Sequence, residues 1–170
     1  MPVRAFRSVC GVLAAVLVVA MSFAIAQARA SMPVRAQAPA EASLPDGPGR
    51  DVVQRVCTVC HGTDFITATE RTVQVWRDTL DLMKGYGAEA TDEEWTTVAR
   101  YLIAQVAYLG VNKAAAEEIG LVFAVDEKVA QGVVAYRQTQ GGFKTIDDLK
   151  KAPGLDPARI DAVKTRLTFE

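Results

Sequence analysis

Half of the 170 residues are apolar and 23% are charged, so the chain is composed like a folded globular protein and not like a disordered one. Its 19 basic and 20 acidic residues nearly cancel, which argues against a protein that holds nucleic acid mainly by neutralising phosphates. No segment has the alternating pattern of a β-strand, and the sequence predicts an all-α protein.

The first segment, residues 1–30, is predicted to be a signal peptide. Arg4 and Arg7 precede the apolar run 9–26, which is followed by small residues up to Ala30. Cleavage there would leave 16 basic and 20 acidic residues, a net charge of −4. We therefore expect export to the periplasm, with a membrane anchor as the alternative if the segment is retained.

Helical signals begin after a proline-containing segment, residues 31–47, which is predicted to be a flexible linker. Apolar spacing predicts a helix over residues 73–84 with Thr72 as its N-cap. Thr91 and Glu94 form a predicted capping box for a helix that runs towards residue 109. Further helices are expected at about 114–120, 127–138, 146–151 and 157–167.

The chemistry is concentrated in Cys57-Thr58-Val59-Cys60-His61, a C-x-x-C-H motif. Two thiols at this spacing can each bind one vinyl group of a single haem, and the adjacent histidine can bind the iron. A thioredoxin-type pair would need a βαβ context, a zinc site would need four ligands, and a plain disulfide would leave His61 unexplained. The motif thus predicts one covalent haem c on Cys57 and Cys60, with His61 as an axial ligand.

The second axial position is assigned to Met83, at the end of the predicted helix 73–84 and just before Gly85. A loop there could bring its sulfur to the iron. The alternative is that Met83 is a core residue, because it shares an apolar stripe with Trp76 and Leu80. No catalytic residue is predicted.

Residues 50–109 resemble a class I cytochrome c domain, and more narrowly the haem domains that accompany quinoprotein and sulfite dehydrogenases. The resemblance rests on the Cys57–Gly62 motif, on Trp76 before Met83, and on the Tyr101-Leu102 pair. It implies a cytochrome domain at 48–109 that transfers single electrons in the periplasm. The partner would be a quinoprotein or sulfite-type dehydrogenase. The chain itself would be an electron carrier or a haem subunit of an oxidoreductase, and not the catalyst.

Residues 111–169 resemble the tandem helix-hairpin-helix domain of exported competence DNA receptors, and a domain is placed at 110–170. The matching segments are Asn112–Glu118, Tyr136-Arg137, Gly141–Lys144, Asp147–Leu149 and Pro153–Asp156. The first hairpin, Val122–Asp126, lacks glycine, its bulky residues are expected to block the backbone, and Asp126 would repel a phosphate. DNA is therefore not expected as a partner, and a protein-docking role is preferred. The alternative function is an exported helix-hairpin-helix DNA-binding protein that carries a haem module.

Overall fold

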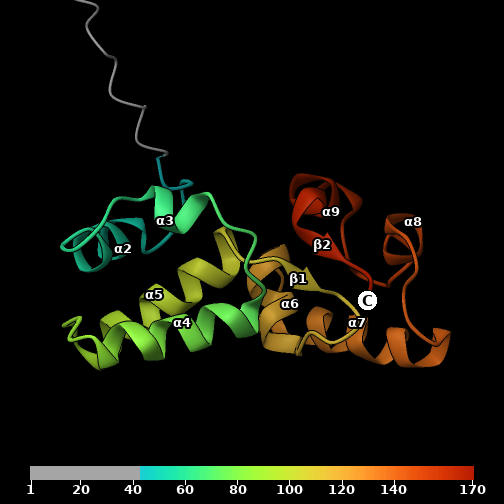
Figure 1. The fold of residues 1–170 in the computed structure, drawn as a ribbon. Coiled ribbons are helices and arrows are strands. Elements are labelled where there is room, and N and C mark those ends of the chain that lie inside the picture. The colour runs from blue at the N-terminus through green and yellow to red at the C-terminus, as the bar shows by residue number, and fades with distance from the viewer. Residues whose placement is uncertain (1–42) are drawn as a thin grey trace, which may run out of the picture. The chain divides into compact units, whose positions relative to one another are not determined.

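The computed structural model describes residues 43–170, and the predicted signal peptide with most of the predicted linker lies outside this range. The described chain is mostly helical, and residues 43–170 all belong to one compact unit (Figure 1). No helix between residues 43 and 170 is both long and apolar enough to cross a membrane.

The first helices of the described chain are α2 (Arg50–Cys57), α3 (Asp64–Thr67), α4 (Val73–Gly85) and α5 (Asp92–Gln105). Helix α5 packs against both α2 and α4 and supplies the centre of this half with Val98, Tyr101 and Leu102, each at most 1% exposed. Their spacing of three and four residues places them on one face of the helix. Contacts with that face fix α2 and α4 around α5.

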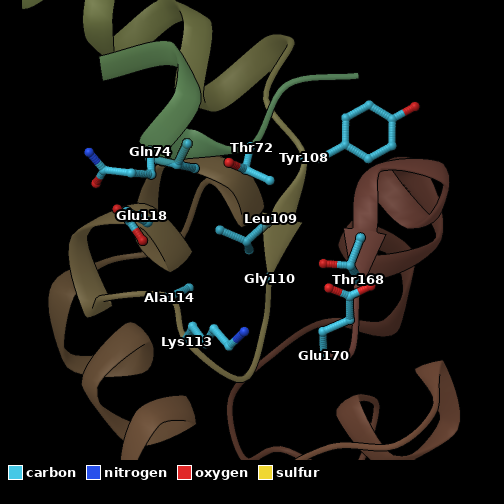
Figure 2. A pocket seen from close by; sticks show the side chains of 11 residues that line it. Thr72, Gln74, Tyr108, Leu109, Gly110, Lys113, Ala114, Glu118, Thr168 and Glu170 are labelled. Atoms are coloured by element: carbon cyan, nitrogen blue, oxygen red, sulfur yellow. The ribbon is translucent and has the colours of Figure 1, made fainter. Parts of the chain in front are cut away.

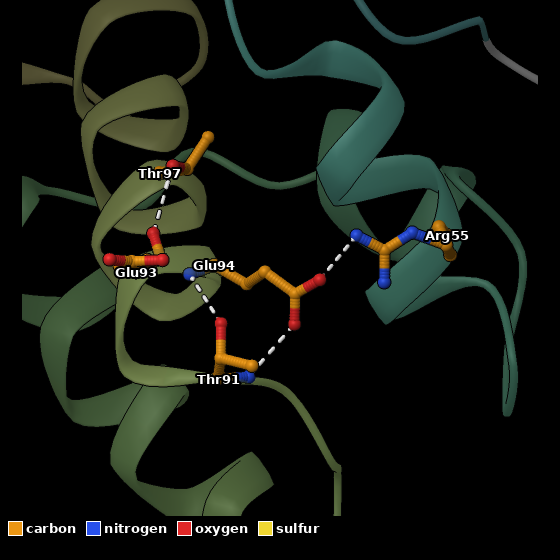
Figure 3. A network of polar contacts seen from close by, with 5 residues as sticks. All are labelled: Arg55, Thr91, Glu93, Glu94 and Thr97. Atoms are coloured by element: carbon orange, nitrogen blue, oxygen red, sulfur yellow. Dashed lines mark hydrogen bonds and ion pairs between the residues drawn. The ribbon is translucent and has the colours of Figure 1, made fainter.

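Both predicted N-caps of this half are present. The Thr72 side chain accepts the Val75 N–H, and α5 begins with the predicted capping box. Within the box, the Thr91 N–H donates to Glu94 Oε2 at 2.8 Å and the Glu94 N–H donates to Thr91 Oγ1 at 3.2 Å (Figure 3). Glu94 Oε1 also accepts a bond from Arg55 of α2 at 2.6 Å, so the start of α5 is tied to the end of α2.

The described end of the predicted linker, residues 43–47, packs on this half. Leu44 is 2% exposed, and the Tyr101 hydroxyl donates a 2.6 Å hydrogen bond to the carbonyl of Pro45. Burial raises the pKa of the Tyr101 phenol, so the hydroxyl stays protonated and keeps this bond at all ordinary pH values. These residues therefore cover the side of α5 that carries Tyr101.

The second half holds α6 (Ala116–Phe123), α7 (Glu127–Gln140), α8 (Ile146–Leu149), α9 (Pro157–Val163) and a 3-10 turn at Lys164–Arg166. Helix α6 packs on α7, on α9 and on α5 of the first half. The predicted helix at 114–120 is thus shifted, because the chain continues helically to Phe123 and turns only at Ala124. The predicted helix at 157–167 ends at Val163.

Two short strands, which the sequence pattern does not predict, join the halves. Strand β1 (Leu109–Gly110) pairs in parallel with β2 (Leu167–Thr168) near the C-terminus. Beside them, Arg166 donates to the carbonyls of Ala107 and Ala104, both at 2.9 Å, at the end of α5. Two-residue strands are too short to show a period in the sequence, so only the fold reveals this pairing.

Candidate nucleic-acid interface

The first hairpin joins α6 to α7 through residues 124–126. Ala124 adopts the left-handed conformation, with φ 51° and ψ 46°, and Asp126 then returns to extended backbone as the N-cap of α7. The Val129 N–H donates to Asp126 Oδ1 at 2.9 Å. Among residues 43–170, no partner is recorded for the backbone N–H groups of Glu127 and Lys128. The turn therefore presents free donors at the start of a 14-residue helix.

The second hairpin joins α8 to α9 and repeats this geometry thirty positions later in the sequence. Gly154 is left-handed with φ 80°, and Asp156 is extended and caps α9 by accepting the Ala158 N–H at 2.8 Å. Ala124-Val125-Asp126 and Gly154-Leu155-Asp156 are thus equivalent turns. In both turns, the left-handed residue is followed by a buried or half-buried apolar residue and then by an extended aspartate.

The expected obstruction of the first hairpin is absent. Phe123 is 1% exposed and lies in the core, and Val125 is half-buried, so neither covers the outer surface of the turn. At the exposed surface of the turn, Ala124 adds only one methyl group and Asp126 adds its carboxylate. The hairpin conformation is therefore kept without glycine.

The two hairpins contact each other's helices. Arg159 of α9 donates from Nη1 to the carbonyls of Phe123, at 3.0 Å, and Ala124, at 2.5 Å. In the other direction, Gly154 lies against Val129 of α7, where an added Cβ would be 3.4 Å from Val129 Cγ2. These reciprocal contacts make the hairpins one structural unit.

The basic residues of this half are mostly engaged. Arg137, Arg159 and Arg166 each bind two backbone carbonyls, and Lys150 and Lys151 pair with Asp161 and Asp148. Burial also holds the pKa of Arg166 below its usual value, although an arginine stays charged at neutral pH. Within the described half, the side chains of Lys113, Lys128, Lys144 and Lys164 form no hydrogen bond or ion pair. Only Lys128 lies in the first turn of α7, next to the first hairpin.

An open groove of about 390 Å³ lies where the two halves meet (Figure 2). Its wall carries both signs of charge, with Lys113 beside Glu118 and Glu170. Glu118 is already bound to Arg77 of α4 at 3.0 Å, and its side chain is only 13% exposed. This mixed charge does not favour an anionic chain, so the hairpins are the better candidate for phosphate binding.

Comparison with known proteins finds similarity in the region that contains the two hairpins. A family model described as "Helix-hairpin-helix motif" matches residues 107–168. Residues 107–168 form a helix-hairpin-helix domain. ComE operon protein 1 of Bacillus subtilis is 31% identical over 64 residues, which are 38% of this chain and 31% of that protein. No solved structure gives a significant match.

Two vertebrate relatives share the name "Endonuclease/exonuclease/phosphatase family domain-containing protein 1". The Xenopus laevis protein is 39% identical over 56 residues, which are 33% of this chain and 10% of that protein. The Danio rerio protein is 36% identical over 59 residues, which are 35% of this chain and 11% of that protein. The chain thus spans about a tenth to a third of the length of these relatives.

These findings correct the main functional prediction. The expectation of a periplasmic monohaem cytochrome that transfers single electrons is wrong, because the matches identify a helix-hairpin-helix domain and none shows a cytochrome c domain. The description as an electron-transfer cytochrome has no support in these matches either. Residues 43–170 also contain no group of three or more His, Cys, Asp or Glu side chains that could hold a metal ion.

The predicted partners also change. A dehydrogenase partner has no support, and the expectation that DNA is not a partner is contrary to the helix-hairpin-helix match. That expectation rested on the lack of glycine in the first hairpin and on the nearly equal numbers of basic and acidic residues. The structure weakens the first argument, because Ala124 reproduces the left-handed turn and Phe123 points into the core.

The cysteine motif lies at the end of α2, away from the hairpins in sequence. Cys57 is half-buried, Cys60 is exposed, and both are free thiols. His61 is half-buried, with Nδ1 3.2 Å from the carbonyl oxygen of Gly62 and its ring centroid 5.1 Å from that of Phe65. Cys60 and His61 line one shallow open cavity with Gln54, Thr58, Val59, Gly62 and Thr63. Met83, half-buried in α4, is not part of its wall.

Sequence reasoning missed Ala124 and Arg159 as functional residues. The signal for Ala124 is present, since Ala124-Val125-Asp126 stands thirty positions before Gly154-Leu155-Asp156 in an equivalent place. Arg159 gives no such signal, because its contact with the first hairpin joins residues 35 and 36 positions apart.

Proposed function

We propose that residues 107–168 bind nucleic acid through the two hairpins. The observation that carries the proposal is that both turns have the same conformation, a left-handed residue followed by an N-capped helix, within the segment that matches the helix-hairpin-helix family. Turns of this kind present backbone N–H groups that can donate to phosphate oxygens. The similarity to ComE operon protein 1 supports the same function.

The charges of the hairpins predict weak binding with only a shallow dependence on salt. Lys128 is a free cation next to the first hairpin, whereas Asp126 and Asp156 place a carboxylate at each turn. Each carboxylate accepts a backbone N–H of its own helix, but it still carries negative charge towards an approaching phosphate. Few phosphate contacts give a shallow dependence of affinity on salt.

The test is fluorescence anisotropy of labelled duplex DNA with the full chain, titrated at several salt concentrations. Asp126→Asn keeps a strong N-cap and removes one negative charge, so binding should tighten by about three- to ten-fold. Lys128→Gln should weaken binding and lower the salt slope by about one. Lys84→Gln, the same charge change in α4 outside the domain, is the matched control and should have no effect.

Two outcomes contradict the proposal. One is that neither the wild-type chain nor Asp126→Asn shows binding that weakens as salt rises. The other is that Lys84→Gln and Lys128→Gln have equal effects, which would place the DNA away from the first hairpin.

We also propose that the exported chain carries one haem c on Cys57 and Cys60, with His61 and Met83 as axial ligands. The cysteine motif itself fits such a group, because two free thiols flank exposed Val59 and Phe65 is 58% exposed beside His61. Met83 does not line the cavity that Cys60 and His61 share, so its assignment rests on the sequence alone. When bound, haem would supply an iron centre next to His61.

Export and haem attachment are tested together. Mass spectrometry of the chain recovered from the periplasm should show loss of residues 1–30 and a gain of one haem. The double variant Cys57→Ser with Cys60→Ser should lack the haem mass, and Met83→Ala should keep it but alter the absorption of the ferric protein. Haem that persists in the double variant would contradict covalent attachment.

A further inference from the structure

The first hairpin reaches its left-handed turn without glycine. Ala124 is the only residue other than glycine with a positive φ between residues 43 and 170. This conformation brings the Cβ of an L residue close to its own backbone, so it is disfavoured for alanine and freely accessible to glycine. The second hairpin makes the same turn with Gly154. The Ala124 turn therefore depends on support from elsewhere in the fold.

That support comes from Arg159. Its Nη1 donates to the carbonyls of Phe123 and Ala124, at 3.0 and 2.5 Å, where α6 ends and the helix offers no further N–H partners. The positive guanidinium also stands at the negative end of the α6 dipole. Helices α6 and α9 pack against each other, which holds Arg159 in reach of the turn.

We propose that Arg159 is a positioning residue for nucleic-acid binding, which fixes the turn at Ala124 and thereby directs the free N–H groups of the first hairpin. This inference rests on the proposed function. The arginine belongs to the helix that follows the second hairpin, so the second hairpin stabilises the first. A nucleic acid would then meet both turns as one preformed surface, with little further ordering on binding.

The decisive variants are Arg159→Gln, Ala124→Gly and their combination, all in the full chain. Arg159→Gln should weaken DNA binding by about ten-fold, and Ala124→Gly in that background should restore most of it. Glycine adopts the left-handed turn without help, so it makes the arginine dispensable. If Arg159 instead bound a phosphate directly, Ala124→Gly would not rescue the variant and the salt slope would fall by about one.

Arg137→Gln is the matched control. Arg137 also binds two carbonyls with Nη1, those of Val111 and Ala114, at 2.7 and 2.9 Å, but these lie before α6 and not at the hairpin. Its loss should lower stability without a specific loss of DNA affinity in the folded protein, and Ala124→Gly should not compensate for it. All binding is measured at a temperature where each variant is folded by circular dichroism.

Amide hydrogen exchange of residues 124–128 without DNA provides a readout that does not depend on the proposed function. Exchange should rise in Arg159→Gln and return towards wild type when Ala124→Gly is added. Unchanged exchange in Arg159→Gln overturns the positioning role, whether or not DNA binds. If exchange changes as expected but the wild-type chain binds no DNA, the proposed function is wrong and the link from the turn to nucleic acid is overturned with it.

Discussion

The halves of the described chain differ in how they cover their apolar side chains. Large apolar side chains that remain exposed all lie between residues 59 and 86, and they are Val59, Phe65, Val75, Leu82 and Tyr86. In the helix-hairpin-helix domain, by contrast, Phe123 and Phe143 are at most 2% exposed, and three arginines bind backbone carbonyls. The domain thus closes its own core, whereas the first half leaves Val59 of the cysteine motif and Phe65 beside His61 exposed, together with three apolar side chains at and after α4.

The same comparison applies to polar groups. Asn112 satisfies three backbone groups of the helix-hairpin-helix domain at once, two of Phe143 and one of Phe169. In the first half, the buried Trp76 Nε1 has no partner among the described residues, although Arg71 stacks on its ring at 4.8 Å. The satisfied polar network around Asn112 and the unpaired indole N–H of Trp76 thus distinguish the two halves of the described chain.

The largest effect is expected when a buried phenylalanine is compared with an exposed one. Phe143→Ala removes a ring that is 2% exposed and stacks with Tyr136 at 6.2 Å, so the free energy of unfolding should fall by about 3–5 kcal/mol. Phe65→Ala removes a ring that is 58% exposed and should change it by less than about 0.5 kcal/mol in the haem-free chain. Urea denaturation measures both, and equal effects would remove the contrast between the halves.

A smaller effect is expected at Asn112. Asn112→Ala removes two donated bonds, at 2.8 and 3.0 Å, and one accepted bond at 2.7 Å, so the free energy of unfolding should fall by about 2–3 kcal/mol. Asn112→Asp is the control, since it keeps the acceptor for the Phe143 N–H but loses both donors. The aspartate should recover only part of the loss in the same denaturation experiment. Full recovery would mean that the donated bonds contribute nothing.

The smallest expected effect is a difference in alkylation rate between the two thiols of the first half, Cys57 and Cys60. Burial raises the pKa of Cys57, whereas Cys60 is exposed, so the Cys57 thiolate forms at higher pH than in an unfolded chain. Iodoacetamide should therefore modify Cys60 first in the haem-free protein, and modification of Cys57 should accelerate as the pH is raised above neutral. Peptide mass spectrometry measures each rate. Equal rates at neutral pH would show that Cys57 is not protected.

Local signals predicted the helical elements well. The Thr72 cap and the box formed by Thr91 and Glu94 are confirmed because each depends on residues three positions apart. The helix-hairpin-helix domain was also predicted from short motifs, since its turns and caps are local. The C-x-x-C-H motif led to a wrong prediction of the main function, because a motif indicates a local site and does not determine what the rest of the chain does.

By itself, the sequence determined that the chain is mostly helical, the caps at Thr72 and Thr91, and the presence of two hairpins in residues 107–168. These follow from side chains that contact their own backbone within one turn. Only the tertiary structure decided that Phe123 is buried, that Ala124 is left-handed, and that Arg159 holds it. Those contacts join segments some 35 positions apart, and the packing of α9 on α6 creates them. The hydrophobic periodicity of the sequence does not predict such packing.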